Sequence, residues 1–270
     1  MKRFLLTAGV CTFIVTVLKV VSVFHFENRE LIYTALSIFL FISGSFVLKL
    51  IAPRMSRKKF FKFQFIKNSD FKLVIHMTAL VISGGFLLNL LTITLLELLG
   101  KIVPANAFSQ FDSANIWLSV FTVAVIPAIF EELFFRGAVL SSLSSDKTIM
   151  AIFVSSLFFS IVHGSLYYFL SNFFAGIVFT VMIYITGSIF ASITAHFFNN
   201  ILSYMLFVYS NRLMTVGYDS FVIWALVLIF LIALYNTVGA VVKKYKEELK
   251  LDRPLINEGE LIWEKRKEKE

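Results

Sequence analysis

Charged residues and cysteines are both scarce in this sequence. Asp, Glu, Lys and Arg make up 16% of its 270 residues, whereas a soluble domain carries about a quarter. The single cysteine, Cys11, excludes an intramolecular disulfide and any metal site built from several cysteines. The sequence also lacks an internal repeat, a Gly-rich phosphate-binding loop and the HExxH pattern of zinc peptidases. Its chemistry therefore rests on a small number of polar residues.

The charges that are present avoid long stretches of the chain. No Asp, Glu, Lys or Arg occurs in the 64 residues from Thr148 to Asn211. A transmembrane helix needs about 20 apolar residues, so this stretch alone accommodates close to three spans. The whole sequence is 58% hydrophobic, contains 32 phenylalanines and has a mean hydropathy of +0.83. We therefore predict an all-α polytopic membrane protein.

Apolar runs separated by short polar breaks predict a bundle of about eight transmembrane helices. The runs cover residues 4–24, 31–52, 73–99, 115–143, 148–163, 166–186, 188–209 and 219–242. The first run follows Lys2 and Arg3 but is longer than the apolar part of a typical signal peptide, so we interpret it as a span. Residues 1–242 form the predicted bundle. Residues 243–270, with nine basic and eight acidic side chains, form a predicted charged cytoplasmic tail.

A basic loop indicates the orientation of the bundle. Residues 53–72 contain seven Lys or Arg and one acidic residue, Asp70, and so supply +6 of the net charge of +8. Short basic loops stay in the cytoplasm. We therefore predict a multi-pass protein of the cell membrane with cytoplasmic N and C termini, whose basic loop contacts the lipid bilayer. Binding of nucleic acid is the weaker interpretation of a basic patch in this position.

Ionisable residues are few in the later helices. They are Glu131, Glu132, Arg136, His163 and His196. A charged side chain at membrane depth costs several kcal/mol unless it has a partner or a water-filled cavity. Glu132 and Arg136 are four residues apart on one helical face, so an ion pair is expected. Glu131 points about a third of a turn away and needs another partner.

His196 shares one helical face with Asn200, while Asn199 is turned away by about 100°. A His and an Asn side by side can donate hydrogen bonds to one oxygen. Polar residues in membranes more commonly just join helices, however. For His163, which precedes Gly164, a helix cap is likewise commoner than catalysis. Taken one at a time, these residues indicate packing as much as chemistry.

Pro127 lies one turn before Glu131 and predicts a kink, because proline removes a helical hydrogen bond and clashes with the preceding turn. With straight helices, Glu131 lies about 22 Å from the outer end of its helix. His163 lies about 22 Å from the inner end of the next helix. The two side chains are therefore expected at different depths, unless the kink, a helix tilt or different helix boundaries bring them together.

Three motifs follow one another between residues 115 and 210. They are Glu131-Glu132-x-x-x-Arg136 with a trailing Gly137, Phe159-x-x-x-His163, and His196-x-x-x-Asn200. Each motif alone is a weak signal. In this order and on apolar helices, the set resembles the signature of the CAAX-protease and bacteriocin-processing family. One position departs from the family pattern: Thr180 stands where a second glycine often follows Gly176, which affects the expected local packing.

The resemblance implies an intramembrane endopeptidase of the glutamic type, a hydrolase that forms no covalent acyl-enzyme. The implied catalytic residues are Glu131, His163, His196 and Asn200, and the implied supporting residues are Glu132 and Arg136. The glutamate, helped by the first histidine, activates water, and the second histidine and the asparagine stabilise the oxyanion. The expected substrate is a peptide or protein at the membrane, in bacteriocin maturation, immunity or peptide signalling.

Other functions remain open from the sequence. No cofactor is implied. Zinc held by two His and a Glu is disfavoured, because these residues lack the i, i+4 spacing of metallopeptidase helices and asparagine is a poor zinc ligand. A non-enzymatic scaffold or immunity protein would keep the polar residues for packing. A transporter would use them to bind ions, but no inverted repeat supports this. The oligomeric state is not indicated.

Overall fold

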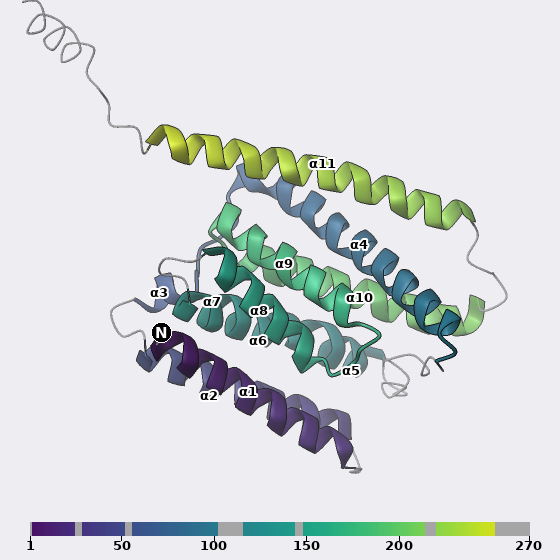
Figure 1. The fold of residues 1–270 in the computed structure, drawn as a ribbon, viewed down its shortest axis with the longest axis horizontal. Helices are drawn as coiled ribbons and strands as arrows, with labels where there is room; N and C mark the ends of the chain where they lie inside the picture. The colour runs from purple at the N-terminus through teal and green to yellow at the C-terminus, as the bar shows by residue number, and fades with distance from the viewer. Residues whose placement is uncertain are drawn as a thin grey trace, which may run out of the picture.

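The computed structural model describes residues 2–24, 29–51, 56–101, 116–143, 148–213 and 220–251 (Figure 1). Over these residues the chain forms helices and no strand, which confirms the predicted all-α class. Apart from the composite helix over residues 116–143, the helical elements are α1 (Lys2–Val23), α2 (Arg29–Ile51), α3 (Arg57–Phe60), η1 (Asn68–Asp70), α4 (Phe71–Leu98), α8 (Thr148–Val162), α9 (Phe169–Thr186), α10 (Ile189–Leu213) and α11 (Ser220–Leu251).

The fourth long helix is continuous from Ile116 to Leu143 but changes its winding four times. It consists of α5 (Ile116–Val120), the π-helical η3 (Phe121–Val125), α6 (Ile126–Glu132), the π-helical η4 (Leu133–Val139) and α7 (Leu140–Leu143). π-Helical turns are rare and concentrate at functional sites. Here they flank the short α-helical segment that carries both glutamates.

Six of the described helices are long and apolar enough to cross a membrane. They are residues Arg3–Val23, Leu31–Leu50, Asn68–Leu98, Ile116–Leu143, Phe169–Thr186 and Val222–Lys244. The helix α8 is apolar but shorter. The last helix, α11, continues to Leu251, nine residues beyond the predicted boundary at 242. Most of the predicted tail, residues 252–270, lies outside the described residues.

The helices lie side by side in one bundle, with α1 and α2 at one edge and α4 and α11 at the other (Figure 1). Among the packed pairs, α11 contacts α4, α4 contacts α9, and α8 contacts α9. The helix α10 packs against α6, η3, α4 and α9. The three motif-bearing segments, α6, α8 and α10, therefore lie in the middle of the bundle, where a charged side chain can be shielded from lipid.

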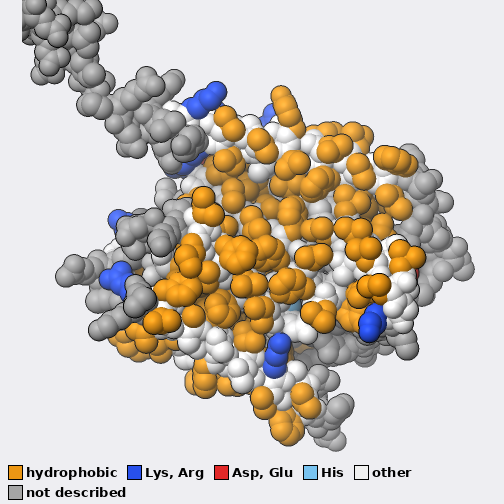
Figure 2. Space-filling view, in the orientation of Figure 1, with side chains coloured by type: hydrophobic (Ala, Val, Ile, Leu, Met, Phe, Trp, Pro, Cys, Tyr) orange, Lys and Arg blue, Asp and Glu red, His pale blue; other side chains and the backbone are white. Residues whose placement is uncertain are grey.

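The outer surface is strongly apolar. Figure 2 shows hydrophobic side chains over most of one face, with Lys and Arg near its margins. Large side chains such as Phe46 and Trp224 are 65% and 70% exposed. Apolar patches of this extent are rare on soluble monomers. They suit acyl chains, which agrees with the membrane spans given above.

Candidate active site

Glu131 lies between two histidines. Its Oε2 atom is 3.8 Å from Nε2 of His163 and 4.0 Å from Nε2 of His196. This oxygen is buried and makes no hydrogen bond within the described residues. Both separations exceed the range of direct hydrogen bonds. The fold thus brings together a glutamate of α6, a histidine at the end of α8 and a histidine of α10.

The neighbouring carboxylate, Glu132, is fully buried and holds two partners with one oxygen. Its Oε1 atom forms an ion pair at 2.9 Å with Nη1 of Arg136, which the four-residue spacing predicted. The same oxygen accepts a hydrogen bond at 2.9 Å from Nδ1 of His196. Glu132 therefore connects α6 to α10 and fixes the ring of one histidine that faces Glu131.

Both histidine rings have their Nδ1 atoms engaged. Nδ1 of His163 lies 2.7 Å from the carbonyl oxygen of Phe159. A carbonyl oxygen only accepts, so this Nδ1 carries the proton, and Nε2 of the neutral ring is an acceptor. In His196 the carboxylate of Glu132 sets Nδ1 as the donor in the same way. His196 can therefore donate from Nε2 only when the ring is protonated.

Aromatic rings enclose the charged residues. The guanidinium carbon of Arg136 lies 4.1 Å from the ring centroid of Phe159 and 5.3 Å from that of Phe179. The ring of Phe179 also stacks on His196, with centroids 5.1 Å apart. A cation above a desolvated ring is attracted by about 2 kcal/mol. Sequence reasoning gave Phe179 no role, because one phenylalanine among 32 carries no positional signal.

Gly176 allows α8 and α9 to approach closely. A Cβ atom at this position would lie 2.9 Å from the backbone Cα of Ser156. Its carbonyl oxygen accepts hydrogen bonds from Nη2 of Arg136 at 3.4 Å and from the hydroxyl of Thr180 at 2.8 Å. Thr180, the position that departs from the family pattern, is thus fully buried and satisfied by the preceding turn. A hydroxyl fits here without disturbing the arginine.

The expectation that Glu131 and His163 lie at different depths is wrong, since their side chains are 3.8 Å apart. The expectation rested on the distance of Glu131 from the outer end of its helix and of His163 from the inner end of the next helix, which are opposite ends of the bundle. Counted from the ends that the two helices share, Glu131 lies 12 residues before Leu143, or about 18 Å. His163 lies 15 residues after Thr148, or about 22 Å. The antiparallel arrangement therefore brings the two to similar depths.

Asn200 lies one turn after His196 on α10, as predicted, and already has a partner. Its Nδ2 atom donates to the carbonyl oxygen of Val123 at 3.2 Å. Asn199, which the helical spacing turned away, donates at 3.3 Å to the side-chain oxygen of Asn200. This second bond sets the orientation of the amide. One of the two N–H groups of Asn200 is therefore engaged, and the other is left for a further acceptor.

The described residues contain no group of three or more His, Cys, Asp or Glu arranged to hold a metal ion. Cys11, on α1, is buried in the hydrophobic core with Ile14 and Leu18.

Comparison with protein families gives a match to the motif-bearing part of the chain. Residues 113–202, a third of the chain, match the model of the type II CAAX prenyl endopeptidases described as Rce1-like. No curated protein and no solved structure matches. The matched segment contains all three motifs and runs from just before α5 into α10. The resemblance to the CAAX-protease and bacteriocin-processing family, a family of membrane-bound peptidases, is thereby confirmed over the segment that builds the Glu131 site.

Proposed function

We propose that this chain is an intramembrane endopeptidase of the glutamic type. Glu131 and His163 activate a water molecule for attack on a peptide bond, and His196 and Asn200 stabilise the oxyanion. The observation that carries the proposal is the position of the Glu131 Oε2 atom. It is buried, makes no hydrogen bond within the described residues and faces two Nε2 atoms at 3.8 and 4.0 Å.

The spacing of these three atoms suits a water molecule as a common partner. Polar atoms that face each other beyond about 3.5 Å are commonly bridged by water. A water molecule beside Glu131 can give one hydrogen bond to the carboxylate and the other to Nε2 of His163, which accepts in the neutral ring. A lone pair of the water oxygen then remains free to attack a carbonyl carbon.

The proposed step balances without a cofactor. The water oxygen forms a bond to the carbonyl carbon, its proton passes to Glu131, and the carbonyl oxygen becomes an oxyanion. Collapse of this intermediate breaks the C–N bond, and Glu131 returns the proton to the leaving amine. General base catalysis of this kind contributes about 10²- to 10⁴-fold in rate.

His196 supports the oxyanion when its ring is protonated, because its Nδ1 is committed to Glu132. In that state the cluster contains two carboxylates, one guanidinium and one imidazolium, and its net charge is zero. Neutral clusters avoid much of the cost of burying charge in a membrane. The second N–H of Asn200 adds another donor from the same face of α10. Each preorganised oxyanion donor is worth about 3 kcal/mol.

The test is cleavage of a fluorogenic peptide library by the purified protein in detergent. The Glu131→Gln variant keeps the shape of the side chain but removes the base, so we expect it to lose at least about 100-fold in rate. Glu97→Gln, an exposed glutamate on α4, is the matched control and should stay active. Equal cleavage by Glu131→Gln and the wild type would contradict the proposal. A folded wild-type protein that cleaves no peptide would favour a scaffold or immunity protein.

A chelator arm separates the glutamic mechanism from a zinc peptidase. Activity that survives the chelator supports the water mechanism. Activity that the chelator abolishes and zinc restores would replace it with metal catalysis, with Glu131, His163 and His196 as the candidate ligands.

A further inference from the structure

A cavity lies at the end of the bundle where the sequence places the cytoplasm. Its volume is about 360 Å³, and its lining residues are Ser56, Lys59, Lys62, Phe63, Gln64 and Gly187. Five of these residues come from the basic loop between α2 and α4, and Gly187 comes from the turn between α9 and α10. The cavity therefore joins two segments that are more than 100 residues apart in sequence, on the side of the loop.

The loop is fixed to that turn by backbone contacts. The N–H of Ile189, the first residue of α10, donates to the carbonyl oxygen of Lys62 at 3.1 Å. The hydroxyl of Ser188 donates to the carbonyl oxygen of Gln64. Gly187 has a φ of +70°, and a Cβ atom there would lie 3.3 Å from the side-chain oxygen of Gln64. The wall of the cavity is thus held by hydrogen bonds and a left-handed glycine.

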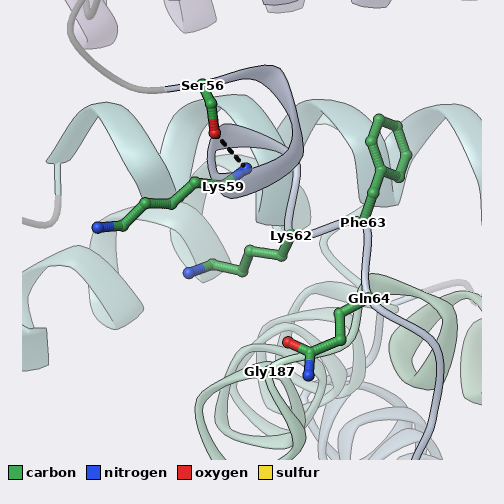
Figure 3. Close-up of a pocket in the computed structure, with 6 residues that line it drawn as sticks. All are labelled: Ser56, Lys59, Lys62, Phe63, Gln64 and Gly187. Carbon is green, nitrogen blue, oxygen red and sulfur yellow. Dashed lines mark hydrogen bonds between the residues drawn. The ribbon is translucent and has the colours of Figure 1, made fainter.

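Two lysines bring uncompensated positive charge to this cavity. Figure 3 shows the side chains of Lys59 and Lys62 extending in the same direction, with both ammonium groups on one side of the loop. No salt bridge joins either lysine to a carboxylate of the described residues. The N-terminal end of α10, which begins beside Lys62, adds the positive end of a helix dipole. The cavity is therefore built for an anion.

The surroundings of Lys62 disfavour its charged form. The pKa of Lys62 is lowered from its usual range by burial and, second, by the charge of Lys59. Its ammonium group lies 5.8 Å from the ring centroid of Tyr184, which offers only a weak compensation. A negative group between the two lysines would remove the repulsion between them.

Exposed aromatic rings indicate where the rest of the ligand lies. Phe63 and Phe65 are 40% and 82% exposed beside the cavity. Both pack on Phe190 of α10, with ring centroids 6.4 and 5.2 Å apart. Exposed phenylalanine rings are apolar and suit acyl chains better than water. A ligand with an anionic group at the lysines and an apolar part at the phenylalanines would match both features.

We propose that Lys59 and Lys62 bind the phosphate of an anionic phospholipid, with the side-chain amide of Gln64 and the hydroxyl of Ser56 as further donors. Lysine binds phosphate as a compact point charge. A phosphate diester carries one negative charge, which matches a site with two lysines better than a zwitterionic head group does. The site lies outside the Glu131 cluster and does not depend on the peptidase mechanism.

The first experiment measures binding of short-chain phosphatidylglycerol to the delipidated full-length protein in a neutral detergent. The Lys59→Gln/Lys62→Gln double variant should bind it about 30-fold more weakly, from the loss of two lysines near the phosphate. The matched control is Lys67→Gln/Lys72→Gln, since these exposed lysines belong to the same loop region but do not line the cavity. It removes the same charge and should change the affinity by less than threefold.

Two outcomes of this titration overturn the proposal. Equal weakening by the two double variants would mean that diffuse surface charge attracts the lipid. Equal binding of phosphatidylcholine and phosphatidylglycerol would remove the charge selectivity. A parallel titration with inorganic phosphate distinguishes the source of the anion, because phosphate that binds where the lipid does not would overturn the lipid assignment.

A second experiment needs no variant. An amine-reactive acylating reagent is applied to the wild-type protein with and without phosphatidylglycerol, and labelling of each lysine is read by mass spectrometry. Bound lipid should slow the labelling of Lys59 and Lys62 at least fivefold and leave Lys67 and Lys72 unchanged. Unchanged labelling at the two cavity lysines, at lipid concentrations that saturate binding, would contradict the site.

Discussion

The side-chain amide of Asn200 pairs with the backbone carbonyl that lies one helical turn before Pro127. Its Nδ2 atom donates to the carbonyl oxygen of Val123 at 3.2 Å. In an α-helix that carbonyl would accept from residue 127, which is proline and has no N–H. An unpaired carbonyl in the interior of a membrane protein is costly, and a neighbouring helix commonly satisfies it. Asn200 of the third motif thus supplies a hydrogen-bond donor one helical turn before Pro127.

This relationship predicts that Pro127 and Asn200 are energetically coupled. Asn200→Ala should destabilise the protein by about 1–3 kcal/mol, since the carbonyl of Val123 loses this donor. The same substitution in a Pro127→Ala background should cost less, because the introduced alanine supplies the backbone N–H. A double-mutant cycle followed by unfolding in detergent should give a coupling above about 0.5 kcal/mol. Strictly additive effects would show that the two positions are independent.

Breaking the buried ion pair should be costly. Arg136→Met leaves the fully buried Glu132 without its guanidinium partner, and we expect a loss of about 3–5 kcal/mol in unfolding free energy. The double variant Glu132→Gln/Arg136→Met removes both charges and should recover part of that stability. Thermal unfolding of the purified variants measures both values. A single variant as stable as the wild type would mean that water or another group replaces the guanidinium.

His163→Gln should affect rate far more than stability. The side chain is 31% exposed and makes one local hydrogen bond, so the unfolding free energy should change by less than about 1 kcal/mol. The cleavage rate should fall about 100-fold, because the acceptor that faces the Glu131 water is lost. His76→Gln is a close control, since Nδ1 of His76 contacts the carbonyl of Lys72 in the same local pattern. Comparable loss of activity in both variants would indicate a general effect on folding.

Two glycine substitutions should have opposite effects. Gly176→Ala places a Cβ 2.9 Å from the backbone of Ser156, so α8 must shift and stability should fall by about 1–3 kcal/mol. Because α8 carries His163, activity should fall as well. Gly85→Ala on α4 meets no atom within 4 Å and should stabilise the helix by about 0.5–1 kcal/mol. Measured unfolding temperatures that shift in opposite directions check both statements.

Much of the fold follows from the sequence because lipid leaves few solutions for an apolar chain. Uninterrupted apolar length predicts a helix, since every backbone group in a bilayer must be paired internally. The pairing of Glu132 with Arg136 follows from their four-residue spacing alone. The similar depth of Glu131 and His163 also follows, once both are counted from the ends that their helices share. Their approach to 3.8 Å does not, because it depends on how the two helices pack.

Other features of the structure cannot be predicted from local sequence patterns. The stacking of Phe179 on His196 joins two helices, and nothing distinguishes this phenylalanine from its neighbours in sequence. The two π-helical segments could not be predicted from the sequence either, since no propensity rule specifies them. The lysine cavity combines a loop with a turn more than 100 residues away. These features depend on tertiary packing, which outweighs local preference.

The π-helical segment Leu133–Val139 gives this helix a particular tolerance of changes in chain length. A π turn contains one residue more than an α turn, so it amounts to an insertion that the helix absorbs. Deleting one residue there would restore regular α winding and leave the two flanks in their present relative rotation. The same deletion in an α-helical turn would rotate everything upstream by about 100° relative to everything downstream, and the two glutamates would leave the bundle interior. Relatives that keep this chemistry should therefore tolerate a single-residue gap in this segment far better than one in the α-helical turns around it.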